Sequence, residues 1–135
     1  MLNMISNTNA AVITQEQFLT DLTPEEASVI EGGKFVLIEK IQAIKADADF
    51  IGKDDTYITI GGRKIWGAKS FSTGQARTVN RGRTFGSSTV VALFDEDLGN
   101  DDPLGSFTVS GLTNGSIVRV SGSGSRYDVY YRVTA

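Results

Sequence analysis

The sequence lacks both cysteine and histidine, although it is 135 residues long. Without these side chains the protein cannot build a Ser-His-Asp triad, a cysteine nucleophile, a thiolate or imidazole zinc site, or a disulfide framework. Any metal ion that it binds must therefore be held by oxygen atoms. Because a chain without cysteine folds equally well in oxidising and reducing surroundings, its cysteine content says nothing about its compartment.

Long apolar runs are also missing, and none approaches the roughly 18 residues that a membrane-spanning helix needs. We therefore expect no transmembrane segment. Apolar residues make up 40% of the chain and charged residues 21%, which is typical of a globular protein. The length predicts one modest domain with a short extension.

Basic residues are absent from the first part of the chain. Residues 1–33 contain five acidic side chains and no lysine or arginine, whereas residues 34–135 contain 13 basic and 11 acidic side chains. The net charge of −3 thus combines an acidic segment with a weakly basic one. We place the boundary between an N-terminal segment, residues 1–33, and a domain, residues 34–135.

The N-terminal segment shows the signals of two short helices. Thr23 suits the N-cap of the second helix, Pro24 its first position, and Gly32 and Gly33 its end. Each helix has an apolar stripe too narrow for a core, which favours docking into a partner's groove. An ordinary secretory signal is excluded, because residues 1–11 lack the basic start and the apolar core that such a signal has.

This segment resembles the double-glycine leader of bacterial peptides and proteins that leave the cell through peptidase-containing ABC transporters. The positions that match are Leu22, Glu26, Ala27, Ile30, Gly32 and Gly33, with Ala27 where the family usually has Leu or Met. The resemblance implies that the leader docks on the exporter's peptidase domain, and that the chain is cut after Gly33. It also implies a cytoplasmic precursor and a product that is secreted or held at the cell surface. The alternative is a helical hairpin that packs on the domain.

Residues 34–135 alternate short β-branched and aromatic runs with Gly, Asn, Asp and Ser, which predicts an all-β, antiparallel β-sandwich of about eight strands. We expect hairpin turns at Gly61-Gly62 and at Asn114-Gly115. The expected strands are 35–46, 56–60, 64–67, 77–85, 89–94, 106–109, 116–120 and 127–133.

Nine of the eleven acidic residues of the domain lie in two segments, each directly after a predicted strand. If the two segments meet, their like charges need a cation, and calcium, which accepts six to eight oxygen ligands, suits them best. An EF-hand is excluded, because the twelfth loop positions are Ile58 and Ser106 in place of glutamate. The alternative is a solvated acidic surface without an ion.

The two acidic segments resemble the calcium loops of C2 domains. The resemblance implies first-loop ligands at Asp49 and Asp55, and third-loop ligands at Asp95, Asp97 and Asp102. It also implies supporting or alternative ligands at Asp47, Asp54 and Asp101. Thr56 departs from the family pattern, which has proline after the second aspartate.

Basic side chains dominate the stretch between the two acidic segments, which contains six of them and no acid. C2 domains can carry an anion-binding groove on the corresponding strands, so an anionic lipid or polysaccharide is a candidate partner. The residues concerned are Arg63, Lys64, Arg81 and Arg83. The alternative is that these are ordinary solvent-facing strand charges. Nucleic acid is not expected, because the domain carries a net charge of only +2.

Taken together, the sequence predicts a secreted, non-enzymatic, calcium-binding sandwich that reaches its place through an ABC exporter. A bacteriocin-like antimicrobial or signalling protein is the alternative function, and a structural sandwich with no bound ion is another. An enzyme that uses carboxylate pairs is not expected, because nothing in the sequence places a substrate cleft between them.

Overall fold

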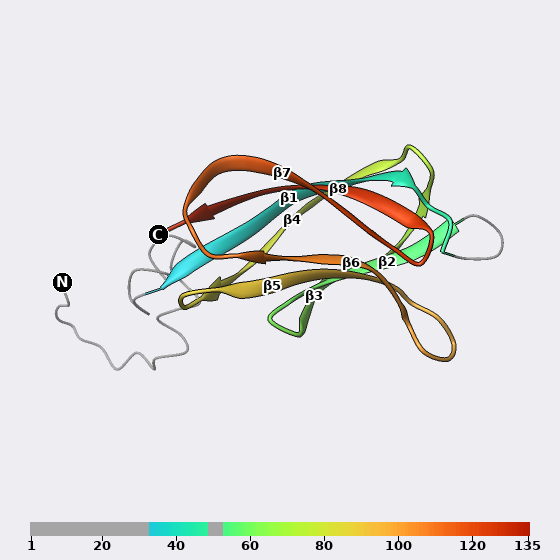
Figure 1. Ribbon diagram of the computed structural model, residues 1–135, viewed down its shortest axis with the longest axis horizontal. Coiled ribbons are helices and arrows are strands. Elements are labelled where there is room, and N and C mark those ends of the chain that lie inside the picture. The colour runs from blue at the N-terminus through green and yellow to red at the C-terminus, as the bar shows by residue number, and fades with distance from the viewer. Residues whose placement is uncertain (1–32, 49–52) are drawn as a thin grey trace, which may run out of the picture.

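A computed structural model of the chain describes residues 33–48 and 53–135, and every regular element in these ranges is a β-strand (Figure 1). The predicted leader helices fall outside the described residues, as does Asp49. Within the described ranges no helix is long and apolar enough to span a membrane. The strands are β1 (Lys34–Lys45), β2 (Lys53–Ile60), β3 (Arg63–Ser72), β4 (Ala76–Phe85), β5 (Thr89–Asp95), β6 (Asp102–Val109), β7 (Thr113–Gly122) and β8 (Ser125–Thr134).

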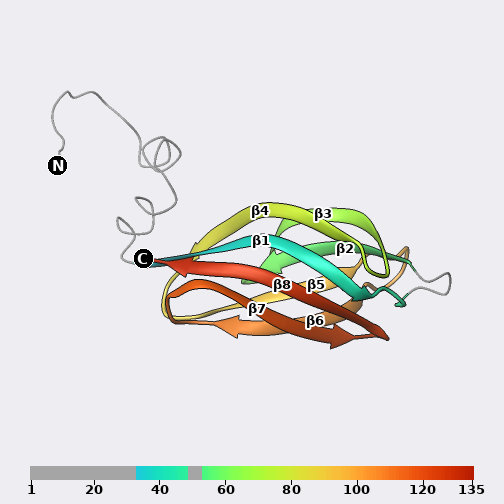
Figure 2. The same cartoon turned by 90° about the horizontal axis from the view of Figure 1, so that it is seen from above.

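The eight strands form two four-stranded antiparallel sheets packed face to face. One sheet has the order β4-β1-β8-β7 and the other the order β3-β2-β5-β6. Figure 1 shows β7 and β8 in the layer above β5 and β6. From above, β3 and β4 lie together along one side and β6 and β7 along the other (Figure 2). The predicted all-β sandwich of eight strands is confirmed.

Alternate side chains of the strands fill the space between the sheets. In β1, Val36 and Ile38 are fully buried, and so are Ile41 and Ala43. These pairs are out of phase with each other by one residue. A shift in the pairing of β1 between Ile38 and Lys40 corrects this, so that both halves of the strand face the core. All eight strands contribute to the core, including Phe71 on β3, Leu93 on β5 and Leu104 on β6.

The two predicted glycine turns have different outcomes. Gly61 and Gly62 join β2 to β3 with φ angles of 61° and 83°, both in the left-handed region that a two-residue primed turn requires. The turn predicted at Asn114-Gly115 is wrong, because both residues lie inside β7. There the pairing with β8 skips from Thr113 to Ser116, and Gly115 has a φ of 123°. Continued pairing with β8 makes this site a bulge in a long strand.

Both acidic segments connect strands at one end of the sandwich (Figures 1 and 2). The first begins in the connection between β1 and β2 and continues into the start of β2 at Asp54 and Asp55, and the second runs from Asp95, the end of β5, to Asp102, the start of β6. The tight β7–β8 turn at Ser123 and Gly124 lies at the same end, whereas β1 begins and β8 ends at the opposite one. The topology therefore gathers acidic residues that are about 40 positions apart in sequence.

Candidate metal site

Three carboxylates of the second acidic segment come together at this end. Asp95, Asp97 and Asp102 each place an oxygen atom within 4.8 Å of the others. Asp95 ends β5 and Asp102 begins β6, and the two residues are register partners, so the hairpin itself sets their separation. Because such close like charges repel, a divalent cation would stabilise the group. Carboxylate oxygens are the ligands that calcium prefers.

Asp95 is fixed in place by the neighbouring strand. Its side chain is fully buried, and its Oδ1 accepts a hydrogen bond of 2.6 Å from the Asp55 backbone N–H. The Glu96 N–H donates in turn to the Asp55 carbonyl oxygen, at 2.8 Å. The backbone of the predicted ligand Asp55 is thus hydrogen-bonded to Asp95 and Glu96. Its own carboxylate is exposed and does not belong to the three-carboxylate group found among the described residues.

Asp101 uses its side chain to hydrogen-bond one residue inside the β5–β6 connection and one on β2. Its Oδ1 accepts a 3.0 Å hydrogen bond from the Asp97 N–H, and its Oδ2 accepts one from the Tyr57 hydroxyl. These bonds, the Tyr57 one first, lower the pKa of Asp101 below its usual range. The same bond is the main reason that the pKa of Tyr57 is raised to about 12. Asp101 therefore holds the connection on the outer face of the sheet.

Tyr57 is a site residue that reasoning from the sequence did not single out. Its ring stacks on Phe94 of β5, with centroids 5.4 Å apart. The Nζ atom of Lys64 lies 4.6 Å from the Tyr57 ring centroid and 3.9 Å from Glu96 Oε2. The only signal in the sequence was its position two residues after Asp55, where the C2 pattern also has tyrosine.

Asp47 and Asp54 differ sharply in their surroundings. Asp47 is exposed, and its Oδ2 lies 3.8 Å from Lys45 Nζ. Asp54 is fully buried, and its carboxylate accepts hydrogen bonds from the Ala48 N–H, the Ser125 hydroxyl and the Tyr127 hydroxyl. Burial raises the pKa of Tyr127 well above its usual range, so that its hydroxyl remains a donor.

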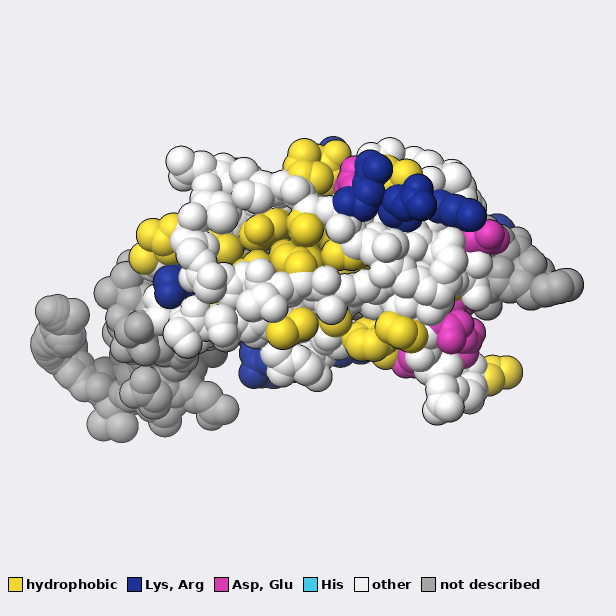
Figure 3. Space-filling model, in the orientation of Figure 1, with side chains coloured by type: hydrophobic (Ala, Val, Ile, Leu, Met, Phe, Trp, Pro, Cys, Tyr) yellow, Lys and Arg dark blue, Asp and Glu magenta, His cyan; other side chains and the backbone are white. Residues whose placement is uncertain are grey.

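An exposed leucine is the second residue that the sequence prediction missed. Leu98 follows Asp97 in the β5–β6 connection, and its side chain is fully exposed. Most of the acidic side chains visible in Figure 3 gather at the same end of the molecule. An apolar side chain in a polar, glycine-containing segment was the signal that could have identified it. The site thus combines an oxygen-rich cluster with an apolar tip.

The predicted anion-binding residues also come together, on β3 and β4. A cavity of about 340 Å³ is lined by Arg63, Lys64, Ile65, Arg81, Gly82 and Arg83. Three of its cations already have protein partners, and for Arg81 the partner is the carbonyl oxygen of the adjacent Asn80, at 3.3 Å. Arg83 donates a 2.6 Å hydrogen bond to the Ile60 carbonyl, and Lys64 faces Glu96. Arg63 and Arg81, both exposed, are the cations best placed to meet a bound anion.

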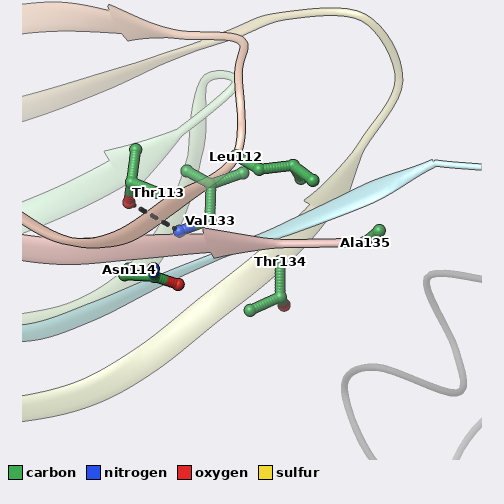
Figure 4. Close-up of a pocket in the computed structure, with 6 residues that line it drawn as sticks. All are labelled: Leu112, Thr113, Asn114, Val133, Thr134 and Ala135. Atoms are coloured by element: carbon green, nitrogen blue, oxygen red, sulfur yellow. Dashed lines mark hydrogen bonds between the residues drawn. The ribbon is translucent and has the colours of Figure 1, made fainter.

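A second cavity, of about 350 Å³, lies at the end of the sandwich where β8 finishes (Figure 4). Its lining residues are Leu112, Thr113, Asn114, Val133, Thr134 and Ala135. Across it, the Val133 N–H donates a 3.2 Å hydrogen bond to Thr113 Oγ1. None of these six residues has a side chain of the kinds that usually serve as a general acid or base.

Gly33 is the one member of the predicted leader that the structure describes. A Cβ atom at this position would lie 2.4 Å from the Phe85 carbonyl oxygen, so packing against the end of β4 also requires glycine here. Lys34 pairs with Phe85 at the start of β1. The predicted cleavage point therefore coincides with the edge of the folded sandwich.

Comparison with solved structures shows that the fold of this sandwich is C2-like. The chain is similar to a structure described as that of a C2 domain, with a TM-score of 0.57 and 14% identity over 76% of this chain and 99% of that one. It is also similar to the two linked C2 domains of extended synaptotagmin 2, with a TM-score of 0.48, 17% identity, and coverage of 99% and 47%. The calcium-bound form of the latter gives a TM-score of 0.44 with 18% identity over 82% and 46%. The first of these likenesses, at 14% identity, shows a shared fold. No family model and no curated protein matches the sequence.

Proposed function

We propose that the sandwich is a calcium-dependent binding module, without catalytic activity, that docks on an anionic lipid surface. The observation that carries this proposal is the meeting of Asp95, Asp97 and Asp102 at one end of a C2-like sandwich. C2 domains are in general binding modules and not enzymes. The fully exposed Leu98 beside the cluster supports a lipid surface as the target.

The calcium ligands in this proposal come from both acidic segments. Asp95, Asp97 and Asp102 supply the core of the site, and Asp49 and Asp55 are the predicted ligands that complete it. Calcium needs six to eight oxygens, so bidentate carboxylates and oxygens of the bound lipid would fill the remaining positions. Asp54 is left out of this set, because its two oxygens already accept three hydrogen bonds from the protein.

The proposed mechanism is charge neutralisation. Without calcium, the acidic end repels an anionic surface and its own carboxylates repel one another. The bound ion removes both effects and leaves Leu98 free to enter the boundary between headgroups and acyl chains. Binding of calcium to the folded state also stabilises that state by mass action.

A calcium titration followed by thermal melting tests the metal site. Calcium at 100 times its dissociation constant should stabilise the protein by about 2.7 kcal/mol and raise the melting temperature. The double variant Asp97→Asn, Asp102→Asn should lose this shift and remain folded. Glu39→Gln is the matched control, because it removes a carboxylate that is paired with Arg132 far from the site. An unchanged melting temperature of the wild type in millimolar calcium would falsify the proposed site.

The basic cavity between β3 and β4 is the second candidate site, for a phosphorylated headgroup. Its support is the convergence of Arg63 and Arg81 on one hollow of about 340 Å³. The variant Arg63→Gln, Arg81→Gln should weaken binding to vesicles that contain a phosphoinositide. Arg126→Gln, which removes an exposed cation on β8, should not. Equal losses in both variants would instead indicate a general effect of positive charge.

We also propose that the protein is made as a cytoplasmic precursor and exported, with removal of residues 1–33. The spacing from Leu22 to Gly33 and the change of composition at Lys34 support this route. Mass spectrometry of the protein outside the cell should find an N-terminus at Lys34. An extracellular protein that keeps its first residues would contradict the proposed leader.

The target of the sandwich is tested separately. Binding to an acidic polysaccharide, and not to vesicles, would indicate a cell-surface polymer as the target in place of a lipid surface.

A further inference from the structure

Asp54 is a buried carboxylate that the proposed calcium site does not use as a ligand. It is fully buried, and it lies directly before Asp55, the residue whose backbone supports Asp95. A charged group is buried at this depth only where hydrogen bonds compensate for its lost hydration. The hydrogen bonds of Asp54 therefore indicate which parts of the chain it holds.

The first of these bonds spans the first acidic segment. Asp54 Oδ1 accepts a 3.0 Å hydrogen bond from the N–H of Ala48, six positions earlier. This contact joins the chain that leaves β1 to the chain that enters β2. Predicted ligands lie on both sides of the contact, Asp49 directly after Ala48 and Asp55 directly after Asp54.

Two hydroxyl groups of β8 meet the other oxygen. Ser125 and Tyr127 donate to Asp54 Oδ2 at 2.8 Å and 2.7 Å, so the carboxylate links the two sheets. Ser125 Oγ also accepts a 2.8 Å hydrogen bond from the Asp47 N–H. Asp54 thus fixes two successive residues of the first acidic segment, Asp47 through Ser125 and Ala48 directly.

The network also reaches the strand beside the three-carboxylate group. Thr56 Oγ1 lies 2.8 Å from the Tyr127 hydroxyl, and since that hydroxyl donates to Asp54, Thr56 must be the donor of this contact. Thr56 is the register partner of Asp95. Asp54 and Thr56, the residues on either side of Asp55, are therefore both held by hydrogen bonds of this network. The Asp55 N–H that lies between them orients Asp95.

We infer that Asp54 is a positioning residue for calcium binding. Its carboxylate holds the Asp47–Ala48 backbone and the Asp54–Thr56 segment of β2 in one arrangement, and it does not contact the ion. This inference rests on the proposed calcium site. Without Asp54 the ligand-bearing segments lose their common anchor, so the ion must order them as it binds. Loss of such supporting partners costs about 10-fold to 100-fold in metal affinity.

The test compares calcium affinity, measured by calorimetry on the full chain, in the wild type and in Asp54→Asn. The asparagine amide presents N–H donors to a site that already holds three donors, so at least one hydrogen bond is lost. We expect the dissociation constant to rise about 10-fold to 100-fold. Glu39→Gln is the matched control, since it removes one carboxylate that is paired with Arg132 on another part of the sandwich and leaves the network intact. It should change the dissociation constant by less than about threefold.

Terbium, used in place of calcium, separates a positioning role from direct coordination. Its luminescence lifetimes in light and heavy water count the water molecules bound to the ion. Asp54→Asn should leave this number unchanged, whereas Asp97→Asn should increase it because a ligand is lost. One additional water molecule in Asp54→Asn would show that Asp54 is a ligand and would overturn the inference.

Ser125→Ala provides a second variant that keeps the charge of Asp54 and guards against poor folding of Asp54→Asn. It should also weaken calcium binding, and its effect should be less than additive with that of Asp54→Asn, because both act through one network. Unchanged affinity in Asp54→Asn, measured below its melting temperature, would limit the network to stability and overturn the inference alone. A wild type that binds neither calcium nor terbium would overturn the calcium proposal as well.

Discussion

The hydroxyl of Tyr57 donates a hydrogen bond to the carboxylate of Asp101, 44 residues further along the chain. Tyr57 lies in the middle of β2, and Asp101 directly precedes β6. Through the Asp97 N–H, which donates to the other oxygen of Asp101, this contact extends to a proposed calcium ligand. The outer face of one sheet therefore helps to set the shape of the acidic end.

This bond predicts a specific alkaline transition. The pKa of Tyr57 is raised from 10.0 to about 12 in the folded protein, chiefly by the hydrogen bond to Asp101. The folded state thus holds the proton more tightly than the unfolded state. The resulting stabilisation is complete below pH 10 and is lost as the pH rises toward 12.

Tyr57→Phe should remove this part of the pH dependence. Its melting temperature should be lower than that of the wild type at neutral pH, and the difference should shrink between pH 10 and pH 12. Thermal melts of both proteins across this range provide the measurement. Tyr130→Phe is a suitable control, because among the described residues no acidic side chain accepts a hydrogen bond from the Tyr130 hydroxyl. A constant difference across the range would count against the Tyr57–Asp101 bond.

Leu98→Ser should reduce calcium-dependent binding to vesicles of phosphatidylserine and phosphatidylcholine without changing calcium affinity. Leu98 is fully exposed, so its removal costs the folded protein no packing, while a bound membrane loses one buried apolar side chain, about 1.5–3 kcal/mol. Vesicle co-sedimentation with calcium gives the measurement. Ile117→Ser on β7, where the side chain is 60% exposed, is the matched control. An equal loss of vesicle binding in both variants would mean that Leu98 has no special role in membrane binding.

Gly82→Ala should destabilise the sandwich by about 1–3 kcal/mol, as overpacking of a tight contact does. A Cβ atom at position 82 would lie 2.2 Å from the Val36 carbonyl oxygen and 2.6 Å from the Phe35 ring. Gly86→Ala serves as its control, because a Cβ atom there meets nothing within 4 Å. Chemical denaturation of the two variants measures the difference. Similar midpoints for both would mean that β1 and β4 can separate enough to admit a methyl group.

Short β-branched and aromatic runs separated by turn residues were sufficient to find all eight strands, but not their lengths. The prediction for the third strand ended at Gly67, whereas β3 continues to Ser72. Lys69, Ser70 and Ser72 of the extension are polar and exposed, so its strand geometry depends on pairing with β2. The Ser and Gly residues at positions 121–125 have a composition typical of a flexible segment. In the structure β7 and β8 pair up to Gly122 and Ser125, which leaves a two-residue turn.

Composition similarly predicted the acidic end without assigning the separate roles of its carboxylates. The resemblance to C2 calcium loops grouped Asp95, Asp97 and Asp102, and the structure brings these three together. Asp54 and Asp55 are adjacent in sequence, yet successive side chains of a strand point to opposite faces. One is consequently buried among hydrogen-bond donors and the other is exposed.

The sequence by itself determined the class of fold and the chemistry that is open to this protein. Periodicity two specifies half-buried strands, and the absence of histidine and cysteine leaves carboxylates as the available anionic metal ligands. Only the tertiary structure decided which carboxylates can share an ion and which serve as supports. The reason is physical: strand pairing and sheet packing join residues 40 or more positions apart, such as Asp55 with Asp95 and Asp54 with Tyr127. No local pattern encodes those distances.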